Sequence, residues 1–256
     1  MKIVMLRRYR LLAALLLTVA EAALAQGATP SYAILSLIGD SVSIHTVRPD
    51  LGGRVPGENR IVVNYPSSVF DQAALVAAGS AIKAAVPEAR STLMMSQDLA
   101  LYQAQNAMFE APAANKDNRD YLLSLLQQQK VSHLVLITKL RDNAALKLAN
   151  GVAGHGRLEG LGFFVDDTIE VRSQESRELR NGIVAPFAYV TIRLLDARTL
   201  EVVREVRVTE STIVARPSTD AAVGTWAAVS DADKVSYLGH LLTQAVTAAM
   251  PQLLPR

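Results

Sequence analysis

The chain has 256 residues, of which half are apolar and none is cysteine. This length suits one large or two small domains whose core needs no disulfide or metal to hold it together. The apolar content, with 26 basic residues against 24 acidic ones, excludes a disordered chain. The lack of cysteine excludes thiolate nucleophiles and cysteine-ligated metal centres.

The first 25 residues have the three parts of an export signal. The cationic segment Met1–Arg10 precedes Leu11–Ala20, an uncharged apolar run, and Ala23 and Ala25 supply small residues at a cleavage site. Ten helical residues span about 15 Å, too little to cross ~30 Å of hydrocarbon. We therefore expect a signal peptide over 1–25, removed on the general secretory route.

The remaining chain, 26–256, is expected to be a single periplasmic or secreted domain with no membrane span. Loss of the signal removes four basic residues and one acidic residue, which leaves 22 basic against 23 acidic and a net charge near −1. The nominal pI of 8.9 therefore does not describe the mature chain. Without a basic patch, nucleic acid is excluded as a partner.

Two β-branched runs open the mature chain. They are Tyr32–Ile38 and Ser41–Val47, and because only Gly39-Asp40 separates them they predict a hairpin with a tight turn. A loop rich in Gly and Pro follows, and Ile61–Tyr65 predicts a third strand.

Strands and helices then alternate. A helix is expected from Ser67 or Ser68 up to Pro87, with Asp71 in a capping-box position. Further elements are expected in chain order as a strand Ser91–Met95, helices over Asp98–Phe109 and Asn118–Gln129, and a strand His133–Leu140 that is typical of strands buried on both faces. The alternation predicts βαβ units with parallel strands over residues 61–140.

The second half predicts antiparallel structure. A glycine cluster over Asn150–Gly162 indicates a flexible connection, and the polar segment 172–182 a mobile loop. Ala188–Leu195 and Val202–Val208 alternate as a hairpin with one buried and one solvated face. A final helix is expected from Ser230. The expected fold is α/β with a mixed sheet, a two- or three-layer sandwich with a βαβ half, antiparallel hairpins and a C-terminal helix on the sheet.

The segment Leu37-Ile38-Gly39-Asp40-Ser41 resembles the first block of the GDSL (SGNH) hydrolases. That resemblance implies Ser41 as the nucleophile, with Asp40 beside it. Those enzymes also need a histidine base with an acidic residue three positions before it. None of the four histidines here has one, so no catalytic residue is expected and the hydrolase with Ser41 and Asp40 is an alternative.

Cofactor and metal sites are not expected either. Gly154-His155-Gly156 with Gly160 approaches a dinucleotide fingerprint, but a strand follows it where a helix is required. His155 with Asp166 and Asp167 lacks the tight spacing of a metal site. His133 and His240 are expected to be structural and solvated, respectively.

The C-terminal half resembles three families of bacterial envelope proteins. A buried strand Val131–Leu140, the turn Leu195-Asp196-Ala197-Arg198-Thr199, a valine-rich return strand and a terminal helix are similar to the curli-secretion component, the lipoprotein activators of penicillin-binding proteins and the N-terminal domain of the Tol-system β-propeller protein. Leu200 stands where that turn usually has glycine. The resemblance implies a small α/β sandwich used for docking or assembly. The whole chain also resembles an uncharacterised family of exported proteobacterial proteins.

The expected function is binding of another envelope component, a protein, without catalysis. The glycine-rich segment and the 172–182 loop are the expected contact surface, because loops on a rigid scaffold usually carry recognition. Two alternatives stay open: the serine hydrolase that uses Ser41, and a periplasmic carrier of a small ligand with its pocket at the ends of the parallel strands.

Overall fold

The computed structural model describes residues 29–47, 58–65, 68–148, 151–154, 156–172, 179–215, 226–227 and 229–254. The predicted signal peptide, with Ala23 and Ala25, lies outside these residues. Contacts divide the chain into units 1–30 and 31–256, and the description below concerns the second. Within the described ranges, no helix is long and apolar enough to cross a membrane.

Among the described residues, ten strands form one mixed sheet, and β7 with β8 forms a separate two-stranded ladder. The strands are β1 (Ser31–Ser36), β2 (Ser41–Val47), β3 (Glu58–Asn64), β4 (Arg90–Met94), β5 (His133–Lys139), β6 (Arg141–Asn143), β7 (Leu146–Leu148), β8 (Gly151–Ala153), β9 (Arg157–Arg172), β10 (Leu179–Asp196), β11 (Val202–Ser211) and β12 (Val214–Ala215). The main path runs β3-β2-β9-β10-β5-β1-β4, while β11 and β12 pair with β10 and β6 pairs with β9.

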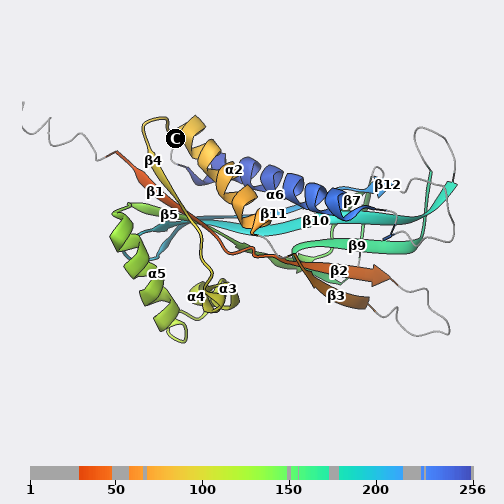
Figure 1. Cartoon of the computed structure of the whole chain (residues 1–256), viewed down its shortest axis with the longest axis horizontal. Coiled ribbons are helices and arrows are strands. Elements are labelled where there is room, and N and C mark those ends of the chain that lie inside the picture. The colour runs from red at the N-terminus through yellow and green to blue at the C-terminus, as the bar shows by residue number, and fades with distance from the viewer. Residues whose placement is uncertain are drawn as a thin grey trace, which may run out of the picture. The chain divides into compact units, whose positions relative to one another are not determined.

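The helices cover both faces of this sheet. They are α2 (Val69–Ala85), α3 (Leu99–Ala104), α4 (Ala107–Glu110), α5 (Lys116–Gln129) and α6 (Asp231–Leu253). Alternate residues of β1 enter different clusters: Tyr32 and Ile34 pack with α2 and α6, whereas Ala33 and Leu35 pack with α3 and α5. The expected mixed α/β sandwich is confirmed, and it has three layers where α3–α5 are present (Figure 1).

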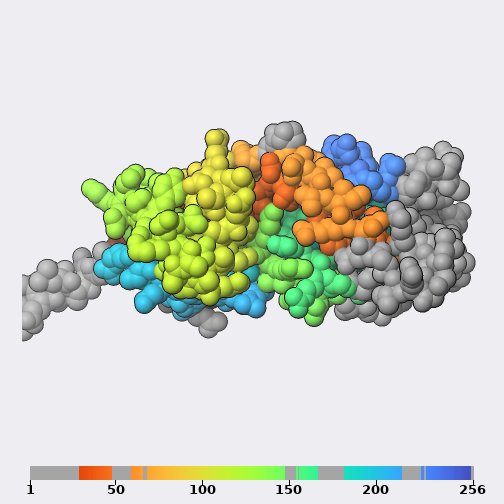
Figure 2. All heavy atoms as spheres, turned by 90° about the horizontal axis from the view of Figure 1, so that it is seen from below, coloured from red at the N-terminus to blue at the C-terminus, as the bar shows by residue number. Residues whose placement is uncertain are grey.

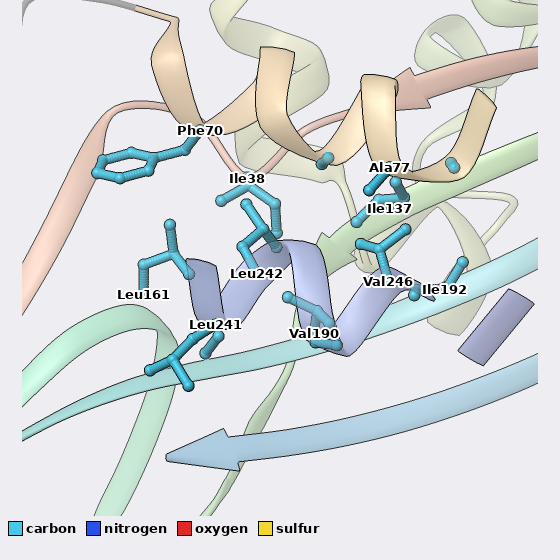
Figure 3. Close-up of a cluster of buried hydrophobic side chains, with 14 of the residues drawn as sticks. Ile38, Phe70, Ala77, Ile137, Leu161, Val190, Ile192, Leu241, Leu242 and Val246 are labelled. Atoms are coloured by element: carbon cyan, nitrogen blue, oxygen red, sulfur yellow. The ribbon is translucent and has the colours of Figure 1, made fainter. Parts of the chain in front are cut away.

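The larger cluster lies between the sheet and the pair α2 and α6 (Figure 3). Leu242 and Val246 of α6 meet Ile137 of β5 and Ile192 of β10 in this layer. The predicted start of α6 is confirmed, since the side chain of Ser230 accepts a hydrogen bond from the Asp233 N–H and so caps the helix. The C-terminal helix is thus packed on the sheet as its apolar stripe predicts.

The parallel strands differ in part from the prediction. β1 lies between β5 and β4 and is parallel to both. β3, which contains most of the predicted strand Ile61–Tyr65, instead pairs antiparallel with β2 at an edge of the sheet. α2 therefore connects β3, at one edge of the main path, to β4 at the opposite edge, and only β4, β1 and β5 form the parallel part of the sheet expected for residues 61–140.

The predicted hairpin at Gly39-Asp40 is wrong. β1 and β2 do not pair with each other, because β2 lies between β3 and β9 while β1 lies between β5 and β4. Gly39 does adopt a positive φ of 70°. Its freedom serves a bend that carries the chain from one half of the sheet to the other, rather than a two-residue turn.

The glycine cluster and the polar loop are shorter than predicted, because β9 and β10 are long. Gly160 and Gly162 lie within β9, where they pair with Tyr189 and Phe187 of β10. Of the predicted loop 172–182, residues 173–178 lie outside the described part, and Leu179 already belongs to β10.

The hairpin of β10 and β11 is confirmed, but its solvated face is not. Thr191 and Arg193 of β10 are 2% and 5% exposed, because α4 lies over them and the Arg193 guanidinium rests on the Phe109 ring. Val202 of β11 is exposed instead. At the turn, Leu200 has a φ of 56° and is nevertheless buried. Its packing therefore offsets the strain that glycine would avoid.

Candidate functional site

The bend between β1 and β2 is built around one buried carboxylate. Asp71, in the first turn of α2, is 3% exposed. It accepts hydrogen bonds from the N–H groups of Ile38 (3.0 Å) and Gly39 (3.2 Å), from the Ser36 hydroxyl, and from the Tyr102 hydroxyl (2.9 Å). The sequence predicted Asp71 as part of a capping box, but it points into this bend.

These donors explain why a carboxylate is tolerated there. A buried charge is costly unless hydrogen bonds replace its lost hydration. Burial and the neighbouring Asp71 raise the pKa of Tyr102 well above its ordinary value. Tyr102 therefore stays protonated and donates to Asp71, which fixes α3 against the bend.

A polar cleft of about 600 Å³ opens beside this bend. It lies where β1, β4 and β5 end, next to the start of α2, which is where open α/β sheets bind ligands. Its wall combines hydroxyl, amide, carboxylate and ammonium groups, which come from Asp40, Ser41, Asn64, Ser68, Gln97, Gln103 and Lys139.

Lys139 and Ser41 meet in this cleft. The Lys139 ammonium Nζ donates to the Ser41 Oγ at 2.7 Å. The backbone of Lys139 is held at both ends, since its N–H donates to Gln105 Oε1 and its carbonyl accepts from Asn106 Nδ2, each at 2.7 Å. The stem of Lys139 packs on Gly160, where an added Cβ would lie 2.9 Å from it.

Burial lowers the pKa of Lys139 below the ordinary value of 10.5, and the charge of Glu159 only partly opposes this shift. At a given pH, a larger fraction of Lys139 is therefore neutral than of an exposed lysine. Asn64 lies directly opposite Ser41 in the ladder of β2 and β3. A serine, a desolvated lysine and an amide thus line one wall of the cleft.

The structure places the candidate hydrolase residues as follows. Ser41 and Asp40 both line the cleft, although Asp40 is exposed to solvent. Ser41 is the first residue of β2, which continues to Val47. The structure places Lys139, rather than a histidine, beside Ser41.

Sequence reasoning missed Lys139 and the true role of Asp71. The signal for Lys139 was its place: it ends the apolar strand β5, and the carboxyl ends of parallel strands meet at one edge of a sheet. No comparable signal marked Asp71, because its partners are 30 or more residues away in the chain.

The other residues considered from the sequence lie only partly within the described ranges. Asp166 lies in β9, while His155 and the side chain of Asp167 fall outside the described residues. Within the described ranges, no group of three or more His, Asp or Glu residues is placed to hold a metal. His240 is exposed on α6 as expected, and His133 stacks on Tyr32 and bonds to the Ser132 hydroxyl.

Comparison with known proteins gives only distant likenesses. No protein-family model matches the chain, and no curated protein matches it. Among solved structures, the PelC dodecamer from Paraburkholderia phytofirmans shares 10% identity over 89% of this chain and 90% of that one, with a TM-score of 0.32. Protein XCC0632 from Xanthomonas campestris, assigned to DUF330, shares 10% identity over 87% and 82%, with a TM-score of 0.37.

Proposed function

We propose that the protein is an exported binding protein of the cell envelope and that the cleft between β1, β4, β5 and α2 binds a small polar ligand. The observation that carries this proposal is the position of the cleft at the carboxyl ends of the parallel strands, with the partly buried Lys139 in its wall. Sites at this edge of an open sheet are formed by converging loops, so a concave surface with fixed polar groups is available without rearrangement.

The lining groups define the class of ligand. Two carboxylates (Asp40 and the buried Asp71), one ammonium and several amides and hydroxyls offer both donors and acceptors without a strong excess of either charge. This combination fits a neutral or zwitterionic molecule, such as a saccharide or an amino acid, rather than a strongly charged one.

Thermal unfolding of the mature protein with single saccharides and amino acids tests this proposal. A ligand at 100 times its Kd stabilises the folded state by ~2.7 kcal/mol. For a domain of this size that corresponds to a rise in Tm of roughly 5 to 10 °C. Lys139→Met should abolish the rise and the exposed control Lys83→Met should retain it. Unchanged Tm values across the whole panel would contradict ligand binding in the cleft.

The envelope protein predicted as a partner remains part of this proposal. The segments of this chain expected to contact that partner are residues 150–162 and 172–182, and they lie only in part within the described residues. Within the first segment, Gly160 and Gly162 belong to β9, and Gly151–Ala153 forms β8.

A second candidate function is acyl transfer by Ser41, favoured by the 2.7 Å contact between its Oγ and Lys139 Nζ. In its neutral form, Lys139 accepts the hydroxyl proton as Ser41 attacks the carbonyl carbon of an ester. The proton then passes from Lys139 to the departing alcohol, which leaves an acyl group on Ser41. A water molecule, deprotonated by Lys139, releases the acid and restores the serine. Asn64, opposite Ser41, is the amide available to the developing oxyanion.

A fluorophosphonate probe, which transfers its phosphonyl group to an activated serine with loss of fluoride, tests this second function. Ser41→Ala should remove labelling and Lys139→Met should slow it about 100-fold or more, whereas Ser68→Ala in the same cleft should label normally. Because burial lowers the pKa of Lys139, the labelling rate should rise with pH and level off below pH 10.5. Equal labelling of wild type and Ser41→Ala would refute acyl transfer at Ser41.

A further inference from the structure

A second cavity, distinct from the strand-end cleft, is lined mainly by arginine side chains. It has a volume of about 280 Å³ and is lined by His45, Arg60, Arg141, Arg157 and Glu159. These residues come from β2, β3, β6 and β9. Figure 2 shows the surface where the orange atoms of β3 border the green atoms of the β6 and β9 region.

The strand registers explain why these side chains converge. His45 lies directly opposite Arg60 in the ladder of β2 and β3. Arg141 lies opposite Glu159 in the ladder of β6 and β9, and Arg157, two residues before Glu159, points to the same face of β9. Three guanidinium groups therefore reach one cavity from three different strands.

Among the described residues, the positive charge in this cavity is only partly balanced. Arginine stays protonated at every relevant pH, so the three guanidinium groups carry three positive charges. Glu159 supplies one carboxylate, 3.8 Å from Arg60. Within the described part of the chain, neither Arg141 nor Arg157 forms an ion pair.

Other cationic side chains in the structure do have a carboxylate close by. The buried Arg193 guanidinium meets Glu205 at 2.7 Å, and Lys147 meets Glu210 at 2.9 Å. A surplus of about two positive charges in a chain with a mature net charge near −1 costs Coulomb energy in the free protein. Binding of an anion removes that cost.

The floor of the cavity is ordered as well. His45 is only 2% exposed, its Nε2 lies 3.2 Å from the Ser43 hydroxyl, and its ring contacts Phe187 edge to face. A buried, hydrogen-bonded imidazole gives the cavity a fixed polar base, which scattered surface arginines do not have.

We propose that this cavity is a binding site for a phosphate group, held by Arg60, Arg141 and Arg157 above His45. Guanidinium groups donate paired hydrogen bonds to oxyanions. Donors from three strands match the tetrahedral oxygens of phosphate, whereas a planar carboxylate is satisfied by one arginine. The volume equals roughly nine water molecules at ~30 Å³ each, enough for a phosphate and part of the molecule that carries it.

The phosphate can belong to a soluble molecule or to a phospholipid headgroup, and two binding measurements separate these sources. Calorimetric titration with inorganic phosphate and with glycerol 3-phosphate at low salt measures the soluble class. Co-sedimentation with vesicles of phosphatidylglycerol, against phosphatidylcholine alone, measures the lipid class. Saturable binding in either assay supports the site, and the assay in which it occurs identifies the source.

The variant Arg141→Gln with Arg157→Gln should weaken that binding at least tenfold. Both side chains are exposed, so the variant should fold normally, and an unchanged Tm checks this. Arg198→Gln, distant in sequence and 86% exposed, is the matched control and should bind like wild type. Absence of binding in both assays, binding that the double variant retains, or preference for citrate over phosphate would overturn the proposal. None of these variants touches the strand-end cleft, so the two sites are tested separately.

Discussion

Replacement of Gly162 by alanine is expected to destabilise the protein by about 3 kcal/mol or more, the upper range for an overpacked core. An added Cβ would lie 2.3 Å from the Ser43 carbonyl oxygen and 2.4 Å from Cζ of Phe187. The first of these atoms is backbone of the neighbouring strand β2, so relief requires separation of β2 from β9. Urea unfolding followed by circular dichroism measures the loss.

Gly239 is the matched control for this substitution. It lies in α6, and nothing lies within 4 Å of a Cβ added there. Gly239→Ala should therefore stabilise the protein by roughly 0.5 to 1 kcal/mol, because alanine loses less backbone entropy in a helix. Similar stability of the two variants would show that β2 and β9 are not packed as described.

Replacement of Asp71 by alanine is the other change with a large expected effect. It removes the acceptor for the N–H groups of Ile38 and Gly39 and for the hydroxyls of Ser36 and Tyr102. Each buried donor left without a partner costs ~1–3 kcal/mol, so the loss of a shared acceptor for four donors should lower the free energy of unfolding by about 4 kcal/mol or more. The same urea titration measures it.

Asp40→Ala provides the comparison for Asp71. Asp40 lies in the same bend but is exposed, so its removal should change stability by no more than about 0.5 kcal/mol. If Asp71→Ala also stayed within about 1 kcal/mol of wild type, the carboxylate would not be the structural centre of the bend. The cleft beside it would then lack the rigid wall on which the proposed binding depends.

Elements whose signals are local were predictable. The apolar run of β5 indicated a strand buried on both faces, and the alternation in β10 and β11 indicated their pairing, which the register confirms. Ser230 marked the start of α6 because capping needs only residues within one turn of the helix.

Elements that depend on distant partners were not predictable in the same way. Gly39-Asp40 suits a tight turn, yet β1 and β2 find their partners elsewhere. The glycines of β9 resembled those of a loop, but Gly162 lies within the strand. Glycine is needed there because Ser43 and Phe187 occupy the space that a side chain would take. The alternation predicted Arg193 as a solvated residue, but α4 covers it in the structure.

The sequence by itself determined the α/β class, most of the elements, and the expectation of export. Only the tertiary structure decided which strands pair, and therefore which polar groups share a cavity. It brought Lys139 to Ser41 across 98 residues and gathered arginines from three strands around His45. Sites of this kind join residues far apart in the chain, so local periodicity does not reveal them. The order of strands in the sheet does.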